Sequence, residues 1–165
     1  MENSMKRSLA PLWLGGLLAL SALPTQASTA TVNVRVTVLS PPCVINGGRT
    51  IEVDFGDSLI ITRVDGNNYT KAVDYTLTCT GNSSNAMKLQ VMGNPTAFEP
   101  SALQTSVADL GIALKANGGA LAVNEWLDFT YPNAPQLQAV PVKRAGATLA
   151  GGEFTAAATL RVDYQ

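Results

Sequence analysis

The chain has 165 residues, a formal net charge of −1 at pH 7, 46% hydrophobic residues and no histidine. Charged residues make up 14% of the sequence and are scattered without runs. This composition argues against a surface for nucleic acid or for an anionic membrane.

The first segment, residues 1–27, has the features of a secretory signal peptide. Lys6 and Arg7 supply a positive start, an apolar run covers residues 9–20, and a small residue at position 27 offers a cleavage point. The apolar run is about a dozen residues long, shorter than the roughly 20 that a membrane-spanning helix needs. We therefore expect export without a membrane anchor, and a mature chain long enough for one domain.

Residues 28–41 form an extension in which apolar and polar side chains alternate. An apolar residue recurs at every second position, at Val32, Val34, Val36 and Val38. Pro41 and Pro42 follow, and two consecutive prolines favour an extended, stiff connection over a tight reversal. We therefore expect this strand to project away from the domain that begins at residue 42.

The two cysteines, Cys43 and Cys79, both lie in the part of the chain that is expected to be exported. An even count in an oxidising compartment favours one disulfide, with two free thiols as the less favoured alternative. The disulfide would close a loop of about 36 residues. A metal or catalytic site is disfavoured because no histidine and no further cysteine is present to complete it. We expect no cofactor.

Short alternating segments separated by Gly, Asn and Pro recur throughout residues 42–165. They lie at 43–45, 51–55, 73–79, 87–91, 110–114 and 154–164. No stretch of helical period competes with them, so the spacing predicts one all-β domain with the immunoglobulin-like sandwich architecture. About six strands are present where a seven-stranded sandwich needs one more, and we expect the domain to be one strand short.

The last alternating strand defines the expected site. Such a strand with nothing to cover it leaves an open edge and an exposed core, which natural proteins normally avoid. The alternating residues are Phe154, Ala156, Ala158, Leu160, Val162 and Tyr164.

These features together resemble the pilin subunits that Gram-negative bacteria assemble by the chaperone–usher pathway. The resemblance covers essentially the whole mature sequence. It rests on the extension that ends in Pro42-Cys43, the second cysteine after residues 73–77, the Leu-Gly-Ile-Ala-Leu segment at 110–114, and the ending from Gly152 to the tyrosine at 164. In detail the chain is most similar to the minor adaptor subunits in the tip of type 1-like fimbriae.

The resemblance implies that each subunit lacks its seventh strand and receives it from a neighbour by donor-strand exchange. The four valines of the extension would form the donor strand. The last strand would provide the acceptor groove and the edge that a periplasmic chaperone binds. The implied partners are that chaperone, an outer-membrane usher and neighbouring pilin subunits, and the implied route runs through the periplasm to a cell-surface fimbrium that supports adhesion.

Other functions stay open at this point. A major shaft subunit is the nearest alternative, because sequence separates it poorly from an adaptor. A receptor-binding adhesin is a second alternative, and it would act through the loop at 126–135, where Trp126 lies near Tyr131. An enzyme is disfavoured, because the carboxylate pairs fit solvated loop and edge charges. Those pairs are Asp54 with Asp57 and Glu125 with Asp128.

Overall fold

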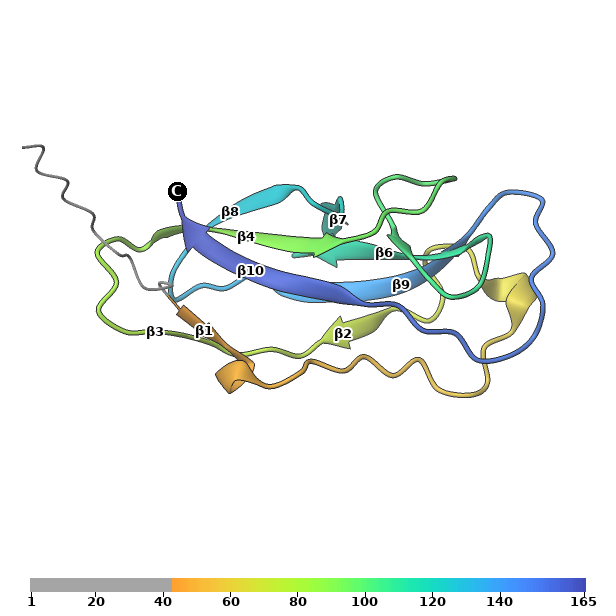
Figure 1. Ribbon diagram of the computed structural model, residues 1–165, viewed down its shortest axis with the longest axis horizontal. Helices are drawn as coiled ribbons and strands as arrows, with labels where there is room; N and C mark the ends of the chain where they lie inside the picture. Colours follow the sequence, from red (N-terminus) through yellow and green to blue (C-terminus); the bar gives the residue numbers. More distant parts are fainter. Residues whose placement is uncertain (1–42) are drawn as a thin grey trace, which may run out of the picture. The chain divides into compact units, whose positions relative to one another are not determined.

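The computed structural model describes residues 43–165, which form ten β-strands and two single-turn 3₁₀ helices (Figure 1). No α-helix occurs within these residues, and the predicted all-β class is confirmed. The strands are β1 (Cys43–Ile45), β2 (Lys71–Val73), β3 (Leu77–Cys79), β4 (Ala86–Gly93), β5 (Leu103–Gln104), β6 (Leu110–Ala116), β7 (Gly119–Leu121), β8 (Trp126–Thr130), β9 (Leu137–Lys143) and β10 (Ala158–Tyr164). The 3₁₀ helices are η1 (Asn46–Gly48) and η2 (Ile61–Arg63).

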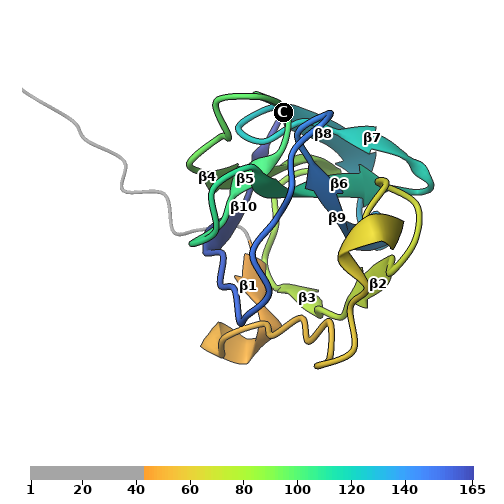
Figure 2. The ribbon, with the colours of Figure 1, turned by 90° about the vertical axis from the view of Figure 1, so that its right-hand side faces the viewer.

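The strands pair in three antiparallel groups. β4 is the middle strand of a sheet with the order β10-β4-β8, and a larger sheet has the order β2-β9-β6-β5, with β7 also paired to β6. β1 pairs with β3 alone among the described strands. Figure 2 shows the β1–β3 pair at the bottom of the view, away from β4 and β8.

The main hydrophobic core lies between the two larger sheets. Met87 and Leu89 on β4 are both 0% exposed, and they share one buried cluster with Ile112 on β6 and Leu137 on β9. Their alternation along each strand places every second side chain in this cluster. The two larger sheets are therefore held face to face by apolar side chains from both.

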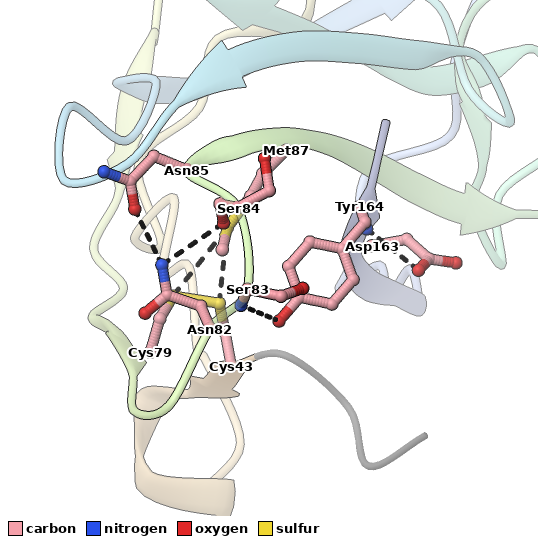
Figure 3. The surroundings of a disulfide bond; sticks show 9 residues. All are labelled: Cys43, Cys79, Asn82, Ser83, Ser84, Asn85, Met87, Asp163 and Tyr164. Carbon is pink, nitrogen blue, oxygen red and sulfur yellow. Dashed lines mark hydrogen bonds between the residues drawn. A yellow bond between two sulfur atoms is a disulfide. The ribbon is translucent and has the colours of Figure 1, made fainter. Parts of the chain in front are cut away.

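The predicted disulfide joins β1 to β3. Cys43 lies directly opposite Cys79 in the strand register, and the S–S bond is 2.00 Å long. The two sulfur atoms lie 3.5 Å and 3.9 Å from the thioether sulfur of the fully buried Met87 (Figure 3). The disulfide is thus confirmed, and it packs the small β1–β3 pair against the middle strand of the neighbouring sheet.

The segment 73–79 is not the single strand that its alternation predicts. It divides into β2, which pairs with β9, and β3, which pairs with β1. Tyr75 lies between them and stays half-buried, and its hydroxyl donates a 2.6 Å hydrogen bond to the carbonyl of Pro135. The side chains of residues 73–79 keep alternating between the core and solvent, although the backbone pairs first with β9 and then with β1.

The predicted loop at 126–135 is also corrected. Its first five residues form β8, which pairs with β4. Trp126 lies on the outward face of that sheet, whereas Tyr131 packs against the core. The two aromatic side chains therefore do not lie together on one exposed surface of a loop.

Candidate functional site

β10 has one free side. It pairs with β4 along its whole length, and no strand among residues 43–165 pairs with its other side. The backbone N–H of Gln165 donates to the carbonyl of Ala86, which shows that the odd-numbered residues bond to β4. The N–H and C=O groups of Leu160, Val162 and Tyr164 therefore point to the free side, which we call the open edge of β10.

Inward-facing side chains become more exposed toward this open edge. Leu160 lies opposite Val91 and Val162 lies opposite Leu89 in the register of the two strands. The two β4 residues are 6% and 0% exposed, whereas Val162 is 9% exposed and Leu160 is only half-buried. Since the paired residues share one face of one sheet, the difference reflects how little covers the far side of β10.

A second unpaired backbone lies in residues 49–60, an extended segment after η1. Val53 and Phe55 are half-buried and pack against the core, while Glu52 and Asp54 are exposed. No backbone–backbone hydrogen bond joins residues 51–59 to any other described residue. The side chains alternate as in a strand, but the backbone donors and acceptors have no neighbouring strand to bond to. The predicted strand at 51–55 is thus extended but unpaired.

An aromatic contact joins the 49–60 segment to the residues that lead into β10. The rings of Phe55 and Phe154 lie 5.9 Å apart between centroids, and Phe154 contacts both hydrophobic clusters of the domain. Strand β1, which precedes the 49–60 segment, contacts β10 without being hydrogen-bonded to it. An unpaired segment and an open edge therefore flank the same part of the core.

The remaining predicted residues of the acceptor site lie at one end of β10 or before it. Ala158 and Ala156 are exposed, and the latter forms a single bridge with Thr105. Gly152 is exposed and has a φ of 143°, a conformation that suits glycine. That these residues accept a strand stays a prediction. The predicted donor strand at 32–38, like the signal peptide at 1–27, lies outside the described residues.

Sequence reasoning missed the part that Gln165 plays at the end of β10. Its side-chain amide donates to the carbonyl of Met87 at 2.8 Å and to that of Phe129 at 3.4 Å. The hydroxyl of Tyr164 accepts a 3.3 Å bond from the backbone N–H of Ser83 (Figure 3). These bonds fasten the end of the open-edged strand to β4, β8 and the loop that precedes β4.

Two surface cavities are lined by residues outside β10. One of about 380 Å³ is lined by residues 72–75 and 134–138, and one of about 630 Å³ by residues 96–98, 104–110 and Arg144. Burial raises the pKa of Tyr75, beside the first cavity, to about 12. Over residues 43–165, no group of three acidic, histidine or cysteine side chains could hold a metal ion. The same part of the chain holds no helix of the length and hydropathy that a membrane span requires.

An all-β sandwich whose sheets are not closed and whose edge strand covers the core incompletely belongs to the class of incomplete immunoglobulin-like domains. The family model described as "Fimbrial protein" matches residues 31–165. The chain therefore belongs to the fimbrial protein family, which is a family of structural subunits rather than of enzymes.

Known proteins of this family resemble the chain over most of its length. The chain is 41% identical over 160 residues to the uncharacterized fimbrial-like protein YfcR of Escherichia coli strain K12, covering 91% of this chain and 92% of that protein. It is 27% identical over 147 residues to the fimbrial adapter PapF of Escherichia coli, covering 81% and 86%.

Solved structures show the same fold. The P pilus adaptor subunit PapF matches with a TM-score of 0.55 and 27% identity, over 76% of this chain and 97% of that one. The P pilus rod subunit PapA matches with a TM-score of 0.64 and 24% identity, over 75% and 99%. The chain is thus a fimbrial subunit of the chaperone–usher kind, close to adaptor subunits, and the predicted incomplete immunoglobulin-like fold is confirmed.

Proposed function

We propose that the chain is a minor, adaptor-type subunit of a chaperone–usher fimbria. It accepts a donor strand along the open edge of β10 from one neighbouring subunit and donates its own residues 32–38 to the neighbouring subunit on its other side. The observation that carries this proposal is that two backbones lack a partner strand: one side of β10 and residues 49–60. Core-facing side chains on both, such as Leu160 and Phe55, are only half-buried.

The donor sequence fits such a site physically. Its four valines would each contribute about 1.5–3 kcal/mol when buried, or roughly 6–12 kcal/mol together before entropy costs. Ladder hydrogen bonds to the open edge would add about 0.5–1.5 kcal/mol each. The register is fixed because a slip of one residue would turn the valines outward and Arg35 inward.

An open edge is an aggregation hazard until a strand covers it. We propose that a periplasmic chaperone lends a temporary strand beside residues 152–164, and that the next subunit's extension replaces this strand at an outer-membrane usher. Chaperone-bound subunits would thus travel through the periplasm and end in a cell-surface fibre that supports adhesion.

The adaptor role is supported by the sequence similarity to PapF, which is an adaptor, over 81% of the chain. A major shaft subunit is the second candidate, and the fold shared with the rod subunit PapA favours it. Counting copies separates the two roles. An antibody to the chain should label one or a few positions near the tip of isolated fimbriae, and labelling along the whole shaft would favour the rod role.

The polymerisation test uses the full chain, exported together with its chaperone and neighbouring subunits. Unboiled samples on a denaturing gel should show a ladder that collapses on boiling. Val34→Asp combined with Val36→Asp should abolish the ladder, because both charges would enter the core of the acceptor. Thr37→Asp places a charge on the outward side of the same strand and should leave the ladder intact.

Two results would contradict the proposal. A ladder that survives the paired valine substitutions would show that residues 32–38 are not the donor strand. A soluble, monodisperse monomer made without any chaperone would show that the domain is complete by itself, and a receptor-binding module would then be the better explanation.

A further inference from the structure

One backbone donor on the open edge of β10 is already occupied. The N–H of Tyr164 points to this edge, and it donates a 2.9 Å hydrogen bond to carboxylate oxygen Oδ1 of Asp163 (Figure 3). The other oxygen of the same carboxylate, Oδ2, lies 3.2 Å from Nη2 of Arg161. The Asp163 carboxylate therefore reaches round to the open edge and lies where the carbonyl of an added strand would bond.

The cations beside this carboxylate lie over the other side of the strand. The guanidinium carbon of Arg161 is 5.2 Å from the ring centroid of Trp126 on β8, and Nζ of Lys88 on β4 is 5.1 Å from the same centroid. Lys88 lies directly opposite Asp163 in the register. Both cations thus gather over the middle of the sheet, while Asp163 extends toward the open edge.

A charged group at an unpaired edge has a known physical effect. It opposes pairing with another strand, because the carboxylate competes for the backbone donor and repels the incoming carbonyl oxygen. Strand addition beside Tyr164 must therefore remove the Asp163 carboxylate from the N–H. The released carboxylate keeps partners within the sheet, since Arg161 already contacts it and Lys88 lies across from it.

We propose that Asp163 guards the open edge of β10 in the unassembled subunit. Its carboxylate occupies the last ladder donor, slows chance pairing between copies, and turns toward Arg161 and Lys88 when a donor strand binds. This inference rests on the proposed function, because it presupposes that β10 receives a strand.

The test measures how fast a strand is added. The full chain is incubated with a fluorescein-labelled peptide that has the sequence of residues 28–39, and fluorescence anisotropy follows association. Asp163→Ala should raise the association rate roughly two- to tenfold, because one hydrogen bond to a solvent-exposed side chain no longer has to break. The same variant without peptide should scatter more light, as copies pair through unguarded edges.

Asp128→Ala is the matched control. Asp128 lies on β8 directly opposite Lys88, as Asp163 does on β10, but it is two strands away from the open edge. Its removal changes the charge of the outward face equally and should leave the association rate unchanged. Asp163→Asn keeps an oxygen that can accept from Tyr164 and should give a rate between those of the wild type and Asp163→Ala.

The possible contrary results are distinguishable. Equal rates for the wild type and Asp163→Ala, with peptide bound in both, would overturn the guarding role and leave strand acceptance standing. Equal acceleration by Asp128→Ala would assign the effect to the charge of the whole face and would also overturn it. Failure of every variant to bind the peptide would overturn strand acceptance at β10, and the guarding role with it.

Discussion

β4 and β10 are neighbouring strands with the same alternation of side chains, yet their apolar residues are buried to different degrees. Met87 and Leu89 on β4 are 0% exposed, whereas Leu160 and Tyr164 on β10 are half-buried. β4 has a partner strand on each side and β10 has one partner within the described domain. Alternation therefore determines which face a side chain takes, and the neighbouring strands determine how far it is buried.

The 49–60 segment extends this comparison to a third case. Its alternating side chains face the core through Val53 and Phe55, but its backbone pairs with no described strand. The same alternation of side chains thus occurs in β4 with two partner strands, in β10 with one, and in the 49–60 segment with none among the described strands. A single strand placed between β10 and the 49–60 segment would give each of them one further partner.

The largest expected effect on stability comes from the disulfide between β1 and β3. Replacing Cys43 and Cys79 together by serine opens a loop of 36 residues and should lower the free energy of unfolding by roughly 4 kcal/mol in the chain-entropy model. Urea unfolding followed by circular dichroism measures the change. The serine variant serves as the control for reductant, which should destabilise the wild type alone. An unchanged urea midpoint for the variant would contradict the prediction.

The next prediction compares β4 and β10 directly. Leu89→Ala removes a fully buried side chain and should cost about 3 kcal/mol of unfolding free energy, whereas Leu160→Ala should cost about 1 kcal/mol in the unassembled subunit. Once a donor peptide is bound, the cost of Leu160→Ala should rise toward that of Leu89→Ala. Urea unfolding with and without the peptide measures both values. An unchanged cost for Leu160→Ala would mean that nothing covers this residue on assembly.

Sequence patterns predicted the features that depend on side-chain periodicity. The strands around Leu89 and Ile112 lie where alternation placed them, and the two cysteines are bonded. The last strand was predicted from residue 154 but begins at Ala158, because residues 155 and 156 bond to residues 106 and 105 instead of to β4. The segment at 51–55 has the same periodicity and remains unpaired. A pattern of side chains specifies the faces of a strand, and it carries no information about whether another backbone lies alongside.

Strand β9 was not among the predicted strands, and it contains Pro141. The register pairs Pro141 with Ile112 of β6, and its carbonyl accepts a bond from Gly66 on the side away from β6. The nitrogen of Pro141, which carries no hydrogen, therefore also faces away from β6. On that side β9 pairs with β2, but this pairing ends at Ala139, before Pro141 is reached. A proline at the point where a neighbouring strand has ended does not interrupt the ladder to the other neighbour.

The local bonds at the end of β10 also lay beyond sequence reasoning. Alternation indicated that Tyr164 faces the core, but the bond between the Asp163 carboxylate and the Tyr164 N–H depends on a side-chain rotamer at an edge. The two carbonyls that Gln165 binds belong to β4 and β8, and they come together only through the register of three strands.

A smaller effect is expected at Gln165, which holds the end of β10 against β4 and β8. Gln165→Ala removes two side-chain hydrogen bonds, to the carbonyls of Met87 and Phe129, and should cost about 1 kcal/mol of unfolding free energy. Gln165→Glu keeps the shape of the side chain but replaces the donor by a charged acceptor, so it should cost at least as much. Hydrogen exchange should also quicken at the amides of β10. Unaltered exchange in both variants would show that the β4 ladder alone holds this end.

The smallest effect is expected at the closed side of the sandwich, where β6 and β9 pair along their whole length. Arg144, just after β9, forms an ion pair with Asp109, just before β6, with Nε 2.7 Å from Oδ1. The hydrogen bonds from Arg144 hold the pKa of Asp109 below its ordinary value of 3.8. A lowered pKa stabilises the folded state above pH 3.8, and this contribution is lost as the pH falls through the folded value.

Asp109→Asn should therefore lower the melting temperature slightly at pH 7, and the difference from the wild type should fade as the pH falls below 3.8. Both side chains are partly exposed, so 1 M NaCl should also reduce the difference. Thermal unfolding at a series of pH values measures it. Because this ion pair joins two strands that already have their partners, the effect should be equal with and without a donor peptide. If the difference in melting temperature between the two proteins grew when the peptide bound, strand addition at β10 would also change the stability of the β6–β9 pair. The β6–β9 pair would then not be independent of the open edge.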